Sequence, residues 1–264
     1  LERRRLRVPP ATDDKRIAGW NALTVSGLAV ASSILGEPRY LDAARDCVRF
    51  LLTRMRDGEG RLLRTWKDGE ARILAFLEDE AFFAVALLDL AEAEPDEAAR
   101  GRWAAEARRV VAGVRRRFSR PGVAGFTFTG EGNEPLLVRT RDLFDKAVPS
   151  APGTAARALA RLARRDGDAA LAAEALAAVE EVSGLMERAP HGIESWHLAW
   201  EELRSGGLLR EPAVAPVATG EPDEDGSGAE PDEADERECP VRVSAVLSTD
   251  RVSRGEMLEV RIAL

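Results

Sequence analysis

The feature that most constrains the fold is a helical hydrophobic period that repeats in pairs along most of the chain. Apolar residues recur at helical spacing in six segments, which are residues 15–35, 38–57, 73–93, 95–118, 155–165 and 168–187. A short turn separates the two members of each pair, and a longer irregular stretch separates one pair from the next. This rhythm predicts a stack of αα-hairpins.

The first helix of a pair is more apolar than the second, as residues 17–34 and 73–90 illustrate. That asymmetry is expected if first helices lie inside a curved layer and second helices cover them from outside. A plain helical bundle remains the alternative. Between the pairs, residues 61–66 predict a short extended segment followed by a turn at Asp68–Gly69, and residues 125–138 predict a small β-hairpin.

The composition changes abruptly near residue 210. Every Trp, Tyr and Phe lies at or before Trp200, and residues 211–240 carry eleven acidic residues opposed only by Arg237. Such a segment cannot bury enough apolar surface to offset its chain entropy, so it is predicted to be a disordered, extended linker. An acidic interaction tail is the alternative.

Beyond the linker, the period changes from helical to alternating. Residues 241–248 and 257–264 read as two β-strands separated by a turn at Gly255, and the chain stops inside the second alternation. We therefore expect three parts: a helical domain at 1–210, the linker at 211–240, and the start of a β-domain at 241–264.

The net charge of −8 belongs to the linker, because residues 211–240 account for −10 and the rest of the chain sums to +2. No nucleic-acid-binding motif is visible, so no nucleic-acid partner is expected. The sequence suggests no membrane span and no signal peptide, and the expected location is cytoplasmic. The two cysteines match no metal or redox spacing, so neither a metal nor a cofactor is predicted.

Four ordered motifs carry a resemblance to a known family. They are DDKRIAGWNAL at 13–23, DGE at 68–70 with FLEDEAF at 76–82, GFTF at 125–128, and the stretch from 137 to 150 that contains LVR and DKAVPS. Together they resemble the DUF255, or spermatogenesis-associated protein 20-like, family, in which a thioredoxin-like domain precedes an (α/α)6 toroid. Residues 241–264 more weakly resemble the opening strands of the N-terminal β-sandwich of DsbD-type thiol:disulfide interchange proteins.

The resemblance implies a mostly α fold: a partial (α/α)6 toroid of the six-hairpin glycosidase type, here its rear half. It also implies a thioredoxin-like partner domain, upstream or in trans. The sequence departs from the family at Ala22, where the family has Gly, at Glu80, where it has Tyr, and at residues 151–153, where it has Gly-Asn-Ser. These departures put the activity of any family site in doubt.

The shared toroid architecture suggests a sugar-like small-molecule ligand, held in a cleft of acidic and aromatic side chains. A glycosidase needs two flanking carboxyl groups about 5–10 Å apart. The candidate carboxyl groups are Asp13, Asp14, Glu78, Asp79, Asp142 and Asp145, and the candidate binding residues are Lys15, Trp20, Asn21, Trp66, Phe76, Glu80, Phe128 and Ser150.

Each candidate also has a structural interpretation. Asp13 or Asp14 is expected to cap the first helix, and residues 78–80 suit a helix-dipole role as well as a cleft. His191 and His197 match no motif, which disfavours an epimerase. Cys47 is expected to be a buried small hydrophobe, and the acidic setting of Cys239 disfavours a thiolate.

No reaction follows from these residues. The first hypothesis is a toroid that binds or processes carbohydrate, and the second is a non-catalytic scaffold for a thiol-redox partner domain. A half-toroid leaves apolar helix flanks uncovered, so we also expect the chain to self-associate unless it is partnered.

Overall fold

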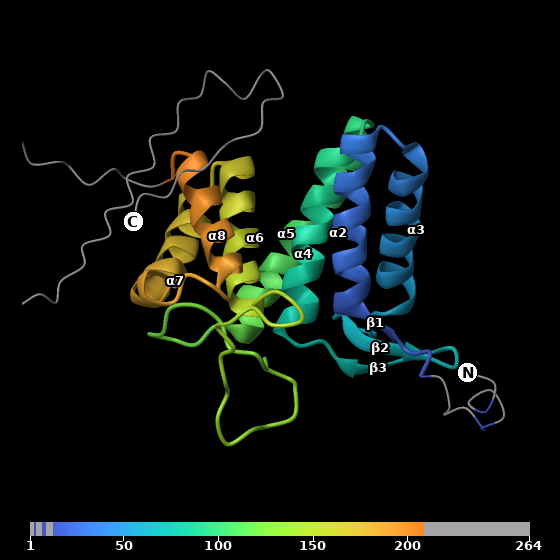
Figure 1. Ribbon diagram of the computed structural model, residues 1–264, viewed down its shortest axis with the longest axis horizontal. Coiled ribbons are helices and arrows are strands. Elements are labelled where there is room, and N and C mark those ends of the chain that lie inside the picture. Colours follow the sequence, from blue (N-terminus) through green and yellow to red (C-terminus); the bar gives the residue numbers. More distant parts are fainter. Residues whose placement is uncertain (1–2, 4–6, 9–12, 209–264) are drawn as a thin grey trace, which may run out of the picture. The chain divides into compact units, whose positions relative to one another are not determined.

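The computed structural model describes residue 3, residues 7–8 and residues 13–208, and this part of the chain is mostly helical (Figure 1). Its helices are α2 (Ala18–Leu35), α3 (Pro38–Arg54), α4 (Leu77–Ala93), α5 (Glu97–Phe118), α6 (Ala151–Asp166), α7 (Ala169–Arg188) and α8 (Glu194–Ser205). Its strands are β1 (Arg16–Ile17), β2 (Leu63–Lys67) and β3 (Glu70–Leu74), which form one antiparallel sheet in that order.

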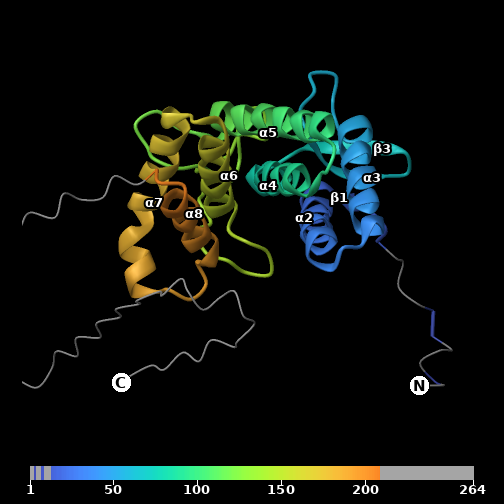
Figure 2. The same ribbon diagram turned by 90° about the horizontal axis from the view of Figure 1, so that it is seen from above.

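The helices form two curved layers, as Figure 2 shows from above. Helices α2, α4, α6 and α8 pack side by side along the inner layer, while α3, α5 and α7 cover α2, α4 and α6 from outside. The inner helices all begin at the end where the sheet and the 119–150 loop lie, which is the lower end in Figure 1. The predicted arrangement of apolar first helices inside and second helices outside is therefore confirmed.

The helix ends follow local chemistry. Gly36 and Gly167 adopt the left-handed conformation that ends α2 and α6, with φ of 66° and 68°. The Asp96 and Asp168 side chains accept hydrogen bonds from the first-turn amides of α5 and α7. These signals are short-range, which is why the three helix pairs could be predicted from the sequence.

Two predicted helices begin later than expected because their first residues join the sheet. Arg16 and Ile17 pair with β2, so the first inner helix starts at Ala18 and neither Asp13 nor Asp14 caps it. The helix predicted from residue 73 starts at Leu77, because Glu70–Leu74 pairs with β2 as strand β3. The partner of β1 is about fifty residues away in sequence, whereas β3 pairs with β2 across the turn at Asp68–Gly69. The helical period registers neither pairing.

Two further predictions need correction. Residues 125–138 form an irregular loop instead of a β-hairpin, and the Phe128 amide donates to the Thr140 carbonyl at 2.8 Å. Helix α8 was not predicted from the sequence. The helix has only 12 residues and directly follows the irregular segment around His191, so its helical period is short. Its buried residues, Trp196, Ala199 and Leu203, pack on α6 and α7 and extend the inner layer by one helix.

Helix α2 qualifies the expectation that no segment could span a membrane. Its 18 residues contain no charged side chain and have a mean hydropathy of 1.3, so by length and composition alone it could cross a bilayer. In the structure, Ala18, Ala22, Val25 and Ala29 are buried, and the helix packs against α3 and α4. One face of α2 therefore belongs to the protein core.

The predicted linker at 211–240 and the predicted β-segment at 241–264 lie outside the described residues. The same holds for Cys239. The three-part division of the chain stays a prediction.

Candidate functional site at the N-terminal ends of the inner helices

Asp79 joins the starts of α2 and α4. Its buried carboxylate accepts from the Gly19 amide at 3.0 Å, the Phe76 amide at 3.1 Å and the Arg64 guanidinium at 2.8 Å. Burial raises the pKa of Asp79 above its ordinary value, although Arg64 and the two amides oppose the shift. Both carboxylate oxygens are used by the protein, so Asp79 anchors two helices and has no free oxygen for a ligand.

Asp145 plays the same part for α6 and α8. Its carboxylate accepts from the Ser150 amide, from the Ser195 hydroxyl, and from the Ser195 amide at 2.8 Å. Burial opposes ionisation, but the hydrogen bonds from Ser195 and Ser150 hold the pKa of Asp145 below its ordinary value. This predicted site residue is an anchor as well.

Two of the six predicted carboxyl groups, Glu78 and Asp142, line a cavity that we call the mouth pocket. Its volume is about 40 Å³, and its lining residues are Glu78, Phe128, Asp142, Phe144, Lys146, Val148, Pro149, Ser150 and Ala151. Glu78 pairs with Arg64 at 2.6 Å and Asp142 with Lys146 at 2.6 Å. The pocket lining thus combines two carboxylates, the Lys146 ammonium group and two aromatic rings.

Phe128, which lines the mouth pocket, packs against a residue that lies outside the lining. Phe128 stacks on Phe76 with ring centroids 5.1 Å apart, and the Arg64 guanidinium lies 5.1 Å from the Phe76 ring centroid. The Ser150 hydroxyl donates to the Asp142 carbonyl at 3.1 Å and accepts from the Gly153 amide at the start of α6. Ser150 therefore caps α6 while it lines the pocket.

A second cavity, the lumen pocket, adjoins the mouth pocket at Pro149. It measures about 100 Å³ and is lined by Leu23, Ser26, Phe82, Val85, Pro149, Thr154, Arg157, Ser195 and Leu198. All four inner helices contribute to it, and its polar groups are three hydroxyls and the Arg157 guanidinium. The lumen pocket was missed from the sequence, because its residues come from four separate helices and form no motif.

A buried charge pair lies behind the lumen pocket. Asp89 accepts from Arg161 at 2.6 Å and from the Ser26 hydroxyl, which ties α4 to both α6 and α2. Arg161 also pairs with Glu92 at 2.8 Å. Asp89 stands in an otherwise apolar run of α4, and that isolated charge is the sequence signal that could have located this network.

Four predicted site residues lie in or next to the three-stranded sheet and line neither pocket: Asp13, Asp14, Lys15 and Trp66. Asp13 pairs with Lys15 at 3.0 Å and Asp14 with Lys67 at 3.2 Å, and the lysines lower the pKa of both exposed carboxyl groups. Trp66 packs edge-on against a neighbouring phenylalanine of α3, with ring centroids 5.5 Å apart. These four predicted cleft residues are not brought to the pockets.

Trp20 and Asn21 occupy the first turn of α2. The Asn21 amide donates to the Ile17 carbonyl at 2.8 Å, and its side-chain oxygen accepts from the Cys47 thiol at 3.6 Å. Trp20 is 60% exposed and lines neither pocket. Asn21 therefore has a structural role. Trp20 belongs to the exposed side of α2, formed by Trp20, Val30, Ile34 and Leu35, which we call the α2 flank.

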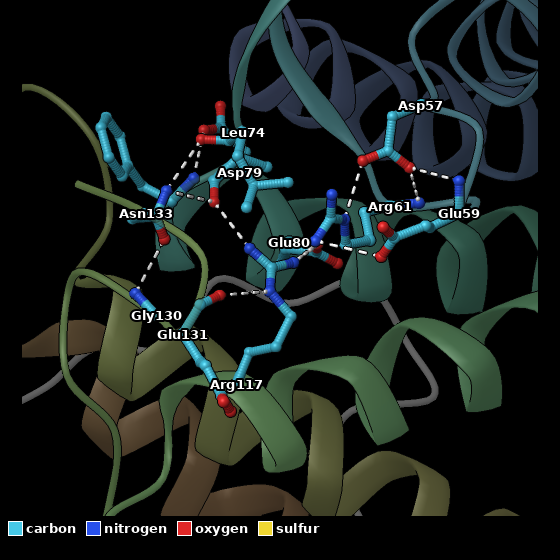
Figure 3. Close-up of polar contacts among 12 residues, drawn as sticks. Asp57, Glu59, Arg61, Leu74, Asp79, Glu80, Arg117, Gly130, Glu131 and Asn133 are labelled. Carbon is cyan, nitrogen blue, oxygen red and sulfur yellow. Dashed lines mark hydrogen bonds and ion pairs between the residues drawn. The ribbon is translucent and has the colours of Figure 1, made fainter. Parts of the chain in front are cut away.

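Glu80 points away from both pockets, toward α5. Its carboxylate pairs with Arg117 at 2.7 Å, and Arg117 also donates to the Ala75 carbonyl (Figure 3). Burial raises the pKa of Glu80 to about 7, against the opposing effect of Arg117. The acidic side chain at position 80 therefore forms a buried ion pair beneath α5 and lines neither pocket.

Among the described residues, Cys47, His191 and His197 add no reactive group to the pockets. Burial raises the pKa of the Cys47 thiol, which disfavours the thiolate. His197 lies within α8, and its Nδ1 is 3.3 Å from the Ile193 carbonyl oxygen, while His191 lies in the preceding turn. Within residues 13–208, no group of three or more His, Cys, Asp or Glu side chains is arranged to hold a metal ion.

No protein-family model matches the chain. It is 34% identical to human spermatogenesis-associated protein 20 over 172 residues, which are 61% of this chain and 21% of the relative. The rat protein of the same name is 34% identical over 160 residues, 57% of this chain and 20% of the relative. The chain thus spans about a fifth of these curated relatives, and the resemblance to the spermatogenesis-associated protein 20-like family is confirmed.

Solved structures with a similar fold include three enzymes of carbohydrate chemistry. D-mannose isomerase matches with a TM-score of 0.51 and 11% identity, over 64% of this chain and 40% of the enzyme. A sugar epimerase from a ruminal bacterium matches with a TM-score of 0.51 and 17% identity, over 64% of this chain and 44% of the enzyme. A family 105 glycoside hydrolase from C. acetobutylicum matches with a TM-score of 0.50 and 14% identity, over 70% of this chain and 55% of the enzyme. The predicted partial α/α-toroid fold is confirmed.

Proposed function

Starting from a chain related to spermatogenesis-associated protein 20 over about three fifths of its length, we propose that the inner layer forms one wall of a carbohydrate-binding cleft. The observation that carries this proposal is the convergence of all four inner helices on the lumen pocket, which adjoins the mouth pocket at the starts of α4 and α6. The fold is shared with a sugar isomerase, a sugar epimerase and a glycoside hydrolase. Fold alone does not carry function, so the lining residues must support the proposal.

The lining suits a polyhydroxylated ligand. Glu78 and Asp142 offer carboxylate oxygens that accept from sugar hydroxyls, and Lys146 and Arg157 offer donors. Phe128 and Phe144 present apolar ring surface beside these polar groups. A small set of polar groups set in apolar walls is the usual lining of a small-molecule site.

The size of the pockets sets the scope of the proposal. At about 40 and 100 Å³, they are smaller than the roughly 300 Å³ at which ligand pockets usually begin. The sugar isomerase and the sugar epimerase are each more than twice as long as the region that matches this chain, since the match covers 40% and 44% of them. We therefore propose one wall of a cleft and assign no reaction to Glu78 or Asp142.

Saccharide titration followed by NMR tests the proposal. A panel of neutral monosaccharides and disaccharides is added to the chain, and chemical-shift changes are mapped to residues. We expect shifts around Phe128, Phe144 and Ser150, and a loss of affinity of about tenfold in Glu78→Gln or Asp142→Asn, because each removes a charged acceptor.

The matched control is Asp13→Asn, which removes an exposed, lysine-paired carboxylate that lines neither pocket. Its affinity should equal that of the wild type. If no saccharide shifts these residues, or if Asp13→Asn weakens binding as much as Glu78→Gln, the proposal is overturned. The second hypothesis, a scaffold for a thioredoxin-like partner, stays a prediction that a pull-down with thioredoxin-like proteins would test.

A further inference from the structure

A third cavity lies beside Glu80, between α5 and the turn that joins α3 to β2. It measures about 270 Å³, and we call it the arginine cavity. It is lined by Arg56, Glu59, Gly60, Arg61, Leu62, Glu80, Glu106, Arg109, Val110, Gly113, Arg116 and Arg117. It shares no lining residue with the mouth or lumen pocket.

The arginine cavity has a surplus of positive charge. Five arginines face three glutamates, and each glutamate is already paired with arginine. The pairs are Glu106 with Arg56 and with Arg109 at 2.9 Å, Glu80 with Arg117 at 2.7 Å, and Glu59 with Arg61 at 3.2 Å. The formal charge of the lining is therefore +2. Asp57, which lies outside the lining and pairs with Arg61 at 2.7 Å, reduces this surplus to +1, which still favours a negatively charged ligand.

Hydrogen-bond donors remain free after these pairs are made. Arg116 forms no ion pair with any residue in the part of the chain that the structure describes, and the buried Nε of Arg56 has no hydrogen-bond partner there. A guanidinium carries five N–H donors, so paired arginines also retain donors for a ligand. An unpaired buried donor is costly, and an oxyanion oxygen would satisfy it.

The cavity has room at its walls because two lining residues are glycines. A Cβ atom built on Gly60 or Gly113 would meet no other atom within 4 Å. Gly60 also has a φ of 77°, the left-handed region that glycine adopts without strain. The turn and the middle of α5 therefore leave open space at the cavity wall. Figure 3 shows two of the lining arginines with their partners, Arg61 beside Asp57 and Glu59, and Arg117 beside Glu80.

We propose that the arginine cavity binds a phosphate group, either free inorganic phosphate or the phosphoryl group of a small organic phosphate. Planar guanidinium forks bind phosphate oxygens in pairs, and arginines from α5 and from the 55–62 turn approach the cavity from two sides. A tetrahedral anion with several oxygens matches donors that converge in this way. This site is independent of the proposed carbohydrate cleft.

Isothermal titration of the chain with inorganic phosphate at low ionic strength tests the proposal, with glucose 6-phosphate and glucose as further probes. The test variant is Arg109→Gln/Arg116→Gln, which removes two exposed cavity arginines and leaves the buried Glu80–Arg117 pair intact. We expect phosphate affinity to fall about tenfold or more in this variant, because charge-assisted donors are lost.

The matched control is Arg102→Gln, an exposed arginine of the same helix that lines no described cavity. It should bind phosphate as the wild type does, and so should Glu78→Gln, because the mouth pocket is separate. Stronger binding of glucose 6-phosphate than of inorganic phosphate would identify an organic phosphate as the ligand, and equal binding would identify free phosphate. Absence of phosphate binding, or an equal loss in Arg102→Gln, overturns the proposal.

Discussion

Helices α4 and α2 are both rich in apolar residues, but they have different surroundings, and only α4 carries charged side chains. Both are the apolar first members of a hairpin, with 17 and 18 residues. Helix α4 packs against α2, α5 and α6 and is buried on almost every face, including its acidic residues Asp79, Glu80 and Asp89. Helix α2 packs against α3 and α4 and leaves Trp20, Val30, Ile34 and Leu35 exposed.

The difference shows that an apolar composition allows a helix to be buried. How much of the helix is buried depends on how many other helices pack against it. Val30, Ile34 and Leu35 line an open apolar depression of about 460 Å³ together with Ser26, Gly27 and Ala31. An exposed apolar patch of this kind is where the expected self-association would make its contacts. Substitutions in the two helices should therefore differ sharply in their effects.

The largest effect is expected from truncating a side chain in α4. Phe83→Ala should lower the free energy of unfolding by about 3–5 kcal/mol, because Phe83 is fully buried and its removal leaves a cavity. Ile34→Ala, the matched substitution on α2, should change it by less than about 0.5 kcal/mol, since Ile34 is 75% exposed. Urea denaturation measures the unfolding free energy of both variants. Equal losses of unfolding free energy would contradict the difference in burial between α4 and α2.

Breaking the buried ion pair of α4 should have an effect of similar size. Arg117→Ala leaves Glu80 without its guanidinium partner and is expected to cost about 3–5 kcal/mol of unfolding free energy at pH 8. The double variant Glu80→Leu/Arg117→Met should recover most of this loss, because two apolar groups replace the pair. A double variant no more stable than Arg117→Ala would show that the ion pair cannot be replaced.

Glu80 should also make stability depend on pH. Its pKa is about 7 in the folded protein, against 4.5 for an unperturbed glutamate, and Arg117, Arg56 and Asp79 are the charged groups that act on it. The unfolded chain therefore loses this proton first, so the free energy of unfolding falls as the pH rises from about 4.5 to 7 and levels off above. Relative to Glu80→Gln, the wild type should lose stability between pH 5 and pH 8. A relative gain would mean that the folded pKa lies below 4.5.

The smallest effect on stability, and a clear effect on assembly, is expected from the α2 flank. Val30→Lys/Ile34→Lys should leave the unfolding free energy within about 1 kcal/mol of the wild type, because both side chains are exposed. In sedimentation velocity, we expect the wild type to self-associate and the variant to shift toward the monomer. A wild-type chain that is a monodisperse monomer would refute the expected self-association.

Local signals made part of the site predictable. Ser150, Phe128, Glu78 and Asp142 were recognised from short motifs, and the structure places all four around the mouth pocket. Asp13 and Asp14 come from an equally strong motif, yet strand pairing of the next residues keeps them at the sheet. The lumen pocket and the arginine cavity were not predicted, because each is assembled from residues far apart in the chain.

The three consecutive acidic residues of α4 show where the sequence stops determining the outcome. By itself, the sequence determined an acidic first turn on an apolar helix, since both follow from local composition and periodicity. Consecutive residues of a helix point about 100° apart, so each carboxylate faces a different neighbour. Only the tertiary structure decided that Glu78 lines the mouth pocket, that Asp79 binds the Gly19 amide, and that Glu80 meets Arg117. Those partners come from three other segments of the chain, and packing alone brings them to α4.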